Sequence, residues 1–135
     1  MNHWLVKSEP NKYSWSQMLK DGETFWDGVR NYQARNNLRE MKVGDLVLFY
    51  HSNIGKEVVG VTKVVKEFYQ DPTTEDPNWV VVNISPVESL PHPVTLEAIK
   101  KDEMLKNVSL IKQSRLSVMP IKREEFDRIL ALSNP

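Results

Sequence analysis

The sequence predicts an α+β fold in which a small twisted sheet curls into a partly closed β-barrel with short flanking helices. Segments rich in β-forming residues occur early, in the middle and late in the chain, and short helical patterns lie between them. Long β segments that meet across many residues favour a curled sheet, and no Gly-rich phosphate loop or dinucleotide fingerprint follows any expected strand. We expect residues 1–135 to form one domain, because no linker, repeat or low-complexity tract divides them.

Charge and cysteine content exclude several classes of function. The 18 basic and 18 acidic side chains cancel, whereas proteins that hold long duplexes by charge are usually basic. The balance argues against strong nonspecific binding and leaves open a small basic rim around one pocket. The absence of cysteine excludes thiol catalysis, cysteine zinc sites and disulfides. The first residues resemble neither a signal peptide nor a membrane span, so we expect no membrane partner. We also expect a cytoplasmic protein and a monomer.

A strand and a short helix are expected first. Residues 3–7 predict a first strand, and Pro10 follows it at a point where a central strand cannot continue. Ser14 and Gln17 match a capping box, which predicts a helix that begins there and runs to about Lys20.

A second helix is expected after the turn pair Asp27-Gly28. Asn31 is a favourable N-cap residue. Ala34, Leu38 and Met41 then repeat at the spacing of one helical face, which predicts that this face is buried.

The middle of the chain predicts three strands. Residues 46–50 are continuously apolar, as in a strand buried on both sides, and a polar loop follows them. Residues 57–69 are β-rich, and Gly60 within them suggests a bulge or a barrel corner. After a loop over 71–78, residues 79–87 alternate as a strand does, and we expect the prolines at 86, 91 and 93 to close that region.

The last third predicts two helices, a further helical turn and a strand. Thr95 caps a short helix, and residues 104–108 form another helical turn. Residues 113–120 return as a strand, and residues 122–132 close the chain as a helix with an apolar face.

The stretch from Phe25 to Arg39 carries the clearest pattern for a ligand site. Trp26 stands just before a helix whose first backbone N–H groups are free, and Arg30 lies close to the N-terminus of that helix. An aromatic face, N–H donors and a cation suit a flat, acceptor-rich ligand such as a nucleobase with its phosphate. The alternative is that Trp26 is half-buried packing and that Arg35 and Arg39 form a solvated face.

Signs of an enzyme are weak. His3, His51 and His92 lack metal-ligand spacing, and no serine lies in a Gly-x-Ser-x-Gly motif. The trio at residues 7–9 suits a polarised base or nucleophile, but Ser8 and Glu9 at a strand end also suit bonds to nearby backbone N–H groups. We therefore expect no metal, no cofactor and no catalytic residue.

Four motifs resemble the EVE domain family over nearly the whole chain. They are Trp4 to Pro10, Trp26 to Asn36, Val43 to Ser52 and Ser114 to Val118. The resemblance implies a PUA-like fold, akin to PUA, ASCH and YTH domains, and a role as a reader of modified nucleobases in DNA or RNA. The chain departs from the family between Tyr69 and Trp79, where many members carry a longer insert, which puts a lid from this loop in doubt.

Carried over to this chain, the resemblance places a pocket between the Lys7-Ser8-Glu9 strand end and the turn from Trp26 to Asn31. Trp26 would stack on an extruded base, while Arg30 and Lys7 would hold phosphate. Ser8, Glu9, Asn31 and the backbone N–H groups near Val29 would contact base edges. Arg115 would reach the same rim or form an ion pair that ties the late strand to the body. The expected ligand-binding residues are Lys7, Ser8, Glu9, Trp26, Gly28, Val29, Arg30, Asn31, Tyr50, His51, Ser52 and Arg115.

The leading hypothesis is a non-catalytic module that reads a modified base of DNA or RNA in an aromatic, polar-rimmed pocket. The base would be extruded from its stack. Affinity would be modest, because the free-energy cost of extrusion is about equal to the free energy gained from one stacking contact and a few hydrogen bonds. The alternative is a small amidohydrolase-like enzyme acting on a modified nucleoside, with Lys7 or Glu9 as general base. A third possibility is a protein-interaction domain.

Overall fold

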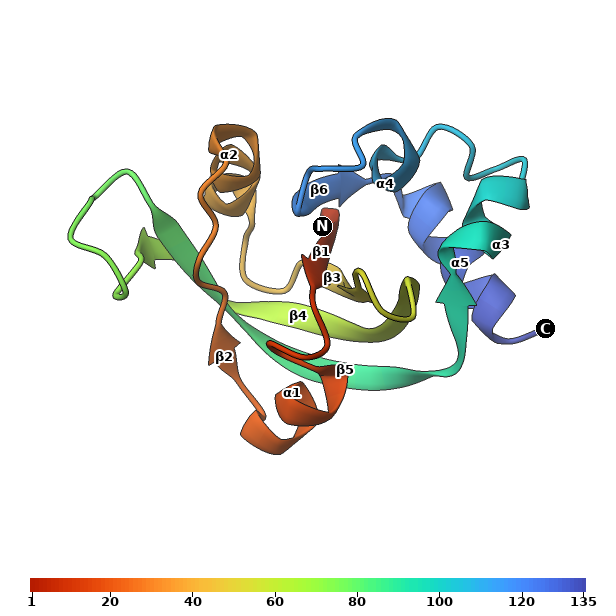
Figure 1. Cartoon of the computed structure of the whole chain (residues 1–135), viewed down its shortest axis with the longest axis horizontal. Helices are drawn as coiled ribbons and strands as arrows, with labels where there is room; N and C mark the ends of the chain where they lie inside the picture. Colours follow the sequence, from red (N-terminus) through yellow and green to blue (C-terminus); the bar gives the residue numbers. More distant parts are fainter.

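A six-stranded mixed sheet forms the centre of the structure, a computed structural model that describes residues 1–135 (Figure 1). The strand order is β2-β5-β4-β3-β1-β6. The strands are β1 (His3–Ser8), β2 (Thr24–Phe25), β3 (Leu46–His51), β4 (Glu57–Gln70), β5 (Val80–Thr95) and β6 (Val118–Ile121). β1 and β3 are parallel, and every other neighbouring pair is antiparallel.

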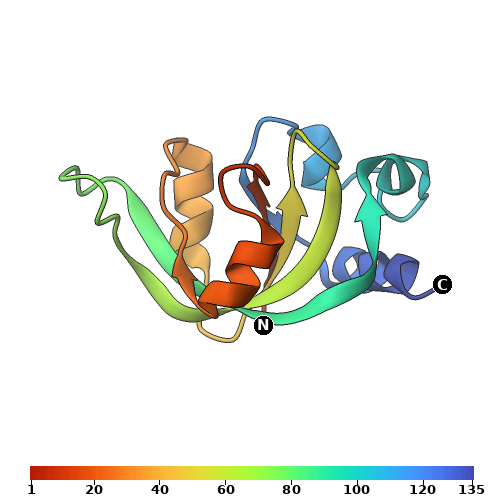
Figure 2. The same ribbon diagram turned by 60° about the horizontal axis from the view of Figure 1, so that its bottom comes forward.

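The sheet is open, so the predicted closure toward a barrel was wrong. β2 and β6 form its two edges and do not pair with each other. β4 and β5 curve strongly, as Figure 2 shows, but a helix, α2 (Tyr32–Glu40), packs against both β5 and β6. Asn37 of α2 donates from Nδ2 to the Val118 carbonyl at 2.7 Å, so this helix takes up a backbone acceptor of the edge strand β6.

Five helices flank the sheet. They are α1 (Trp15–Asp21), α2, α3 (Leu96–Lys101), α4 (Ser109–Lys112) and α5 (Arg123–Ser133). None of them has the length and apolar character that a membrane-crossing helix needs.

The predicted helix caps are confirmed. The side chains of Ser14, Asn31 and Thr95 accept hydrogen bonds from backbone N–H groups of α1, α2 and α3. Ala34, Leu38 and Met41 are fully buried, as their spacing predicts. The capping box at α1 is only half formed, because the Gln17 side chain accepts no hydrogen bond from the Ser14 backbone N–H and its amide instead donates to Asp21.

β5 continues through the prolines that were expected to end it. It runs to Thr95, and its pairing with β4 is irregular at several points. Pro86 lies next to one register shift, and Pro91 and Pro93 fall between the paired residues Ser89 and Val94. A proline is tolerated in a strand where no ladder hydrogen bond is required of it, so bulges allow the long strand.

Gly60 lies at a bulge, as predicted. The register of β4 with both β3 and β5 shifts between Val58 and Gly60. A Cβ atom at position 60 would lie 2.2 Å from Cζ2 of Trp15, so only glycine lets the indole pack on the strand. The close approach anchors α1 against the sheet.

Near the C-terminus two predicted boundaries were wrong. The predicted strand over 113–120 begins only at Val118, and residues 113–117 form a connection instead. Residues 104–108 form turns, and the short helix α4 follows them. The predicted closing helix is confirmed as α5.

Candidate functional site

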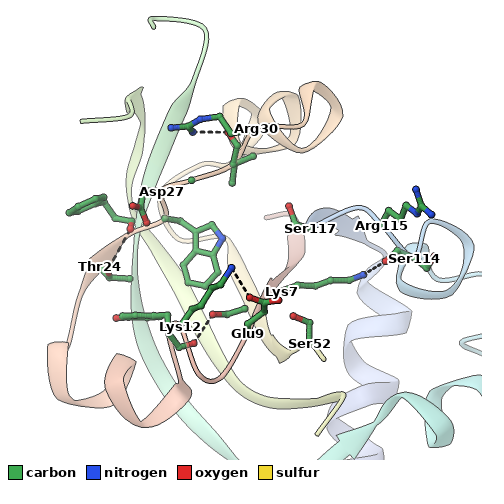
Figure 3. Close-up of a pocket in the computed structure, with 16 residues that line it drawn as sticks. Lys7, Glu9, Lys12, Thr24, Asp27, Arg30, Ser52, Ser114, Arg115 and Ser117 are labelled. Carbon is green, nitrogen blue, oxygen red and sulfur yellow. Dashed lines mark hydrogen bonds and ion pairs between the residues drawn. The ribbon is translucent and has the colours of Figure 1, made fainter. Parts of the chain in front are cut away.

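A cavity of about 680 Å³ opens where β1 ends (Figure 3). Its walls come from the end of β1, the loop before α1, the connection from β2 to α2 and the connection from α4 to β6. The volume lies within the range of small-molecule sites, roughly 300–1,000 Å³. Chain segments more than a hundred residues apart therefore share one polar-rimmed cavity.

Most of the predicted site residues line this cavity. They are Lys7, Ser8, Glu9, Trp26, Gly28, Val29, Arg30, Ser52 and Arg115. Further lining residues were not predicted, namely Lys12, Tyr13, Thr24, Phe25, Asp27, Ser114 and Ser117. Three of these, Phe25, Asp27 and Ser114, stand next to predicted residues in the sequence. Lys12 and Tyr13 arrive through a turn in which their N–H groups donate to the Glu9 carbonyl, a backbone fold that side-chain patterns do not reveal.

Three predicted residues lie outside the cavity. Tyr50 is buried in the core, with 3% of its surface exposed. His51 Nε2 accepts a hydrogen bond from the Trp15 backbone N–H at 3.0 Å, and burial lowers the pKa of this imidazole although Glu57 opposes the shift. The Asn31 side chain caps α2 at Ala34 N. The predicted contacts of these three residues with a base remain untested predictions.

Trp26 belongs both to the core and to the cavity wall. Its exposed fraction is 8%, and its ring lies nearly perpendicular to Phe49 and to Tyr13, at interplanar angles of 81° and 83°. Trp26 is thus packed in the core, as the alternative supposed, and it also lines the cavity.

The indole N–H of Trp26 distinguishes it from the two indoles packed deeper in the core. Trp4 donates to Asp45 and Trp15 donates to Ser89. No protein acceptor lies within hydrogen-bond distance of Trp26 Nε1, and this nitrogen is not fully buried. The cavity wall therefore offers one uncommitted aromatic N–H donor.

The turn after Trp26 is held by Asp71, which sequence reasoning placed in a plain loop. The Gly28 N–H donates to Asp71 Oδ2 at 3.1 Å, with Gly28 at φ +76°, a conformation that favours glycine. Burial acts to raise the pKa of the Asp71 carboxyl, but hydrogen bonds from Thr73, Gly28 and Arg30 outweigh it and bring the pKa to about 2. The ionised carboxylate thus fixes the cavity wall.

Two of the predicted phosphate ligands already have partners within the protein. Arg30 donates from Nη1 to Asp71 and to the Val29 carbonyl, both at 3.0 Å. Lys7 donates from Nζ to the Ser114 carbonyl at 2.7 Å, and burial lowers the pKa of this ammonium group. Their predicted contacts with phosphate remain predictions. Arg115, by contrast, forms no ion pair, so the alternative that it ties the late strand to the body is not seen.

The two carboxylates of the cavity differ in their partners. Glu9 pairs with Lys12 at 2.9 Å and accepts from the Asn53 amide. Asp27 is exposed and makes no hydrogen bond or ion pair with the protein, so its oxygens are free for a ligand donor. Ser8 is buried and its hydroxyl donates to the Tyr13 carbonyl at 2.6 Å, whereas the alternative had this side chain accept from a nearby backbone N–H group. No group of three or more His, Asp or Glu side chains is placed to hold a metal ion.

The Val29 backbone N–H adds a second free donor. It makes no hydrogen bond with any protein acceptor, although the side chain of Val29 is buried. The residues that line the cavity on this one turn of chain thus include the Trp26 indole N–H and the Val29 N–H without protein acceptors, a free carboxylate and apolar side chains.

Comparison with solved structures shows the same fold in several proteins. Protein Atu2648 from Agrobacterium tumefaciens superposes with a TM-score of 0.97 and 43% identity, covering 100% of this chain and 97% of that one. The human THYN1 protein in complex with 5-methylcytosine-containing DNA superposes with a TM-score of 0.93 and 35% identity, covering 100% and 99%. An ASCH protein from Zymomonas mobilis, at a TM-score of 0.59 and 12% identity, shares the fold alone and agrees with the expected PUA-like class.

Comparison with known protein sequences finds relatives that align with nearly the whole chain. Thymocyte nuclear protein 1 of Gallus gallus is 38% identical over 164 aligned positions, which cover 96% of this chain and 68% of the relative. The Mus musculus protein is 38% identical and the alignment covers 97% of this chain and 73% of the relative. The alignment of 164 positions exceeds the 135 residues of this chain, so the relative carries residues that this chain lacks. The EVE domain model matches residues 2–132, and the chain therefore belongs to the EVE domain family.

Proposed function

We propose that this protein binds nucleic acid that carries a modified cytosine, and that the modified base enters the cavity beside Trp26. The observation that carries the proposal is the set of uncommitted polar groups in that cavity: the Trp26 indole N–H, the Val29 N–H and the Asp27 carboxylate. Support comes from the human THYN1 complex with 5-methylcytosine-containing DNA, whose protein is 35% identical to this chain.

The free groups match the polar edge of cytosine. Cytosine presents O2 and N3 as acceptors and the N4 amine as donor, and acidic side chains are the usual acceptors for N4. In this proposal Trp26 and Val29 supply the donors and Asp27 accepts from N4. Phe25, which is 41% exposed, supplies apolar surface for a substituent at C5.

Entry into the cavity requires a base that has left its stack. Extruding a base from a duplex costs a few kcal/mol, so single strands and weakened pairs are the favoured ligands. The formal net charge of +0 gives little general attraction to duplex DNA, which leaves the cavity contacts to supply most of the affinity.

We propose binding without catalysis. The hydrolase alternative needs Lys7 or Glu9 as a general base, and both side chains are engaged, Lys7 with the Ser114 carbonyl and Glu9 with Lys12 and Asn53. Mass spectrometry of modified nucleosides recovered after incubation tests this part, since any product mass would support the enzyme.

Fluorescence anisotropy with short labelled single strands tests the proposal. Matched strands carry cytosine, 5-methylcytosine, 5-hydroxymethylcytosine or N6-methyladenine at one position. Asp27→Asn should weaken binding of the preferred cytosine strand by roughly 10-fold, the effect of one good base contact. Asp76→Asn is the matched control, because Asp76 is exposed and lies outside the cavity. Equal binding of all strands by the wild-type protein would contradict the proposal.

A further inference from the structure

A second, smaller hollow of about 330 Å³ adjoins the main cavity. It is lined by Asn31, Gln33, Gln113, Ser114, Arg115 and Leu116. Ser114 and Arg115 line both hollows, so one short segment of chain is the wall between them. A ligand longer than one nucleotide can therefore reach the second hollow directly from the first.

Both sides of the second hollow are fixed within the protein. Lys7 donates from its backbone N–H to the Ser117 carbonyl at 2.9 Å and from Nζ to the Ser114 carbonyl at 2.7 Å. Leu116, only 4% exposed, anchors the same segment in the core. On the opposite side Asn37 ties α2 to Val118 of β6. The hollow is thus formed before any ligand arrives.

The chemistry of the second hollow differs from that of the first. No carboxylate lines it, whereas Glu9 and Asp27 line the main cavity. The amides of Gln33 and Gln113 and the guanidinium of Arg115 make no hydrogen bond with the protein. Figure 3 shows the Arg115 side chain directed away from Lys7 and Glu9, on the outer side of the shared wall.

These features match a nucleotide joined to the one in the main cavity. Side-chain amides carry both donors and acceptors and pair with base edges, and arginine binds phosphate through two parallel N–H groups. We propose, resting on the function proposed above, that the second hollow receives the nucleotide next to the modified one. Gln33 and Gln113 contact its base, and Arg115 binds the phosphate between the two nucleotides. Binding then depends on the identity of one neighbouring base.

Isothermal titration of mononucleotides against dinucleotides tests this inference. The ligands are 5-methyl-dCMP and the dinucleotides that carry each of the four bases on either side of 5-methylcytosine. The best dinucleotide should bind roughly 10-fold more tightly than the mononucleotide, the gain expected from one base contact and one phosphate contact. The double variant Gln33→Ala, Gln113→Ala should remove most of that gain and leave the mononucleotide affinity unchanged, because neither glutamine lines the main cavity. Arg115→Ala, at the wall that both hollows share, should lower the dinucleotide affinity more than the mononucleotide affinity.

Arg123→Ala is the matched charge control. Arg123 lies on α5, is 80% exposed and lines neither hollow, so its loss should leave the dinucleotide gain intact. The inference is overturned if dinucleotides bind no tighter than 5-methyl-dCMP, or if Arg123→Ala removes the gain as fully as Arg115→Ala. The proposed function survives that result, because the mononucleotide still binds. Failure of every modified ligand to bind would overturn both.

Discussion

Arg30 Nη1 and Asp71 Oδ2 lie 3.0 Å apart and join two residues that are 41 positions apart in the sequence. The Asp71 side chain is fully buried, and it also accepts hydrogen bonds from Gly28 and Thr73. Asp71 immediately follows β4, so the long β4–β5 hairpin holds the turn that carries Trp26, Asp27 and Val29. The shape of the cavity therefore depends on a residue that does not line it.

Asp71→Asn should destabilise the protein and loosen the cavity. The substitution removes the charge that Arg30 and two N–H groups bind, and hydrogen bonds to charged groups contribute roughly 1.5–3 kcal/mol each to stability. We expect a loss of about 2 kcal/mol in the free energy of unfolding, measured by urea denaturation. Glu75→Gln is the control, because Glu75 is exposed in the same loop without a partner.

The pH dependence of this difference identifies its cause. The pKa of Asp71 is lowered to about 2 in the folded protein, so its ionised form stabilises the fold above its ordinary pKa of 3.8. That contribution is lost as the pH falls from about 4 toward 2. The free energy of unfolding of the Asp71→Asn variant should therefore change less with pH in this window than that of the wild type. An unchanged gap between wild type and variant across this window would contradict the assignment.

His51 should make stability sensitive to mild acid. Its Nε2 accepts from the Trp15 N–H, which a protonated ring cannot do, and burial lowers its pKa. The neutral form is favoured in the folded state, so stability is full above about pH 6.5 and falls as the pH drops toward the lowered folded pKa. His51→Gln keeps an acceptor, so the midpoint of thermal unfolding should fall less between pH 7 and pH 5 in this variant than in the wild type. His92→Gln, at an exposed position, should leave the pH dependence of the midpoint unchanged.

Gly60→Ala should cost about 1–3 kcal/mol of stability or more, the usual range for overpacking. The new Cβ would meet three atoms of the Trp15 ring, the nearest being Cζ2 at 2.2 Å, so the strand or the ring must shift. Combining Gly60→Ala with Trp15→Leu should give a loss smaller than the sum of the single losses, because the smaller side chain relieves the clash. Strict additivity in chemical denaturation would contradict this explanation.

Trp26→Phe is the variant that separates binding from folding at the cavity. Truncation to alanine removes a side chain that is 92% buried, and such changes typically cost roughly 3–5 kcal/mol. Phenylalanine keeps the aromatic packing and removes the free indole N–H. We expect roughly 3- to 10-fold weaker binding of a modified strand with the protein still folded, the value of one hydrogen bond. Trp79→Phe, outside the cavity, should bind as the wild type does.

Local chemistry made much of the fold predictable. Cap residues such as Asn31 act within a few positions, and Gly60 marks a bulge that its own lack of a side chain allows. Barrel closure was not predictable in this way, because it depends on whether distant edges meet, and here α2 packs against both β5 and β6. The passage of β5 through Pro91 and Pro93 likewise depends on which positions the partner strand leaves unpaired.

The site was predictable where its residues carry the family motifs and unpredictable where it depends on long-range contacts. Lys7 and Trp26 both stand in such motifs and both line the cavity. Asp71 lies in a segment whose composition indicates only a loop, and its role exists because the hairpin brings it to Gly28. The engagement of Arg30 by Asp71 follows from the same contact.

The measurement that tests the central claim most directly compares two single strands that differ by one C5 methyl group on cytosine. Fluorescence anisotropy gives both dissociation constants under one salt condition. The account predicts that the methylated strand binds more tightly by roughly 10-fold, within the range that one methyl group supplies in a fitted pocket. Equal dissociation constants for the two strands, or no binding of either, would contradict it.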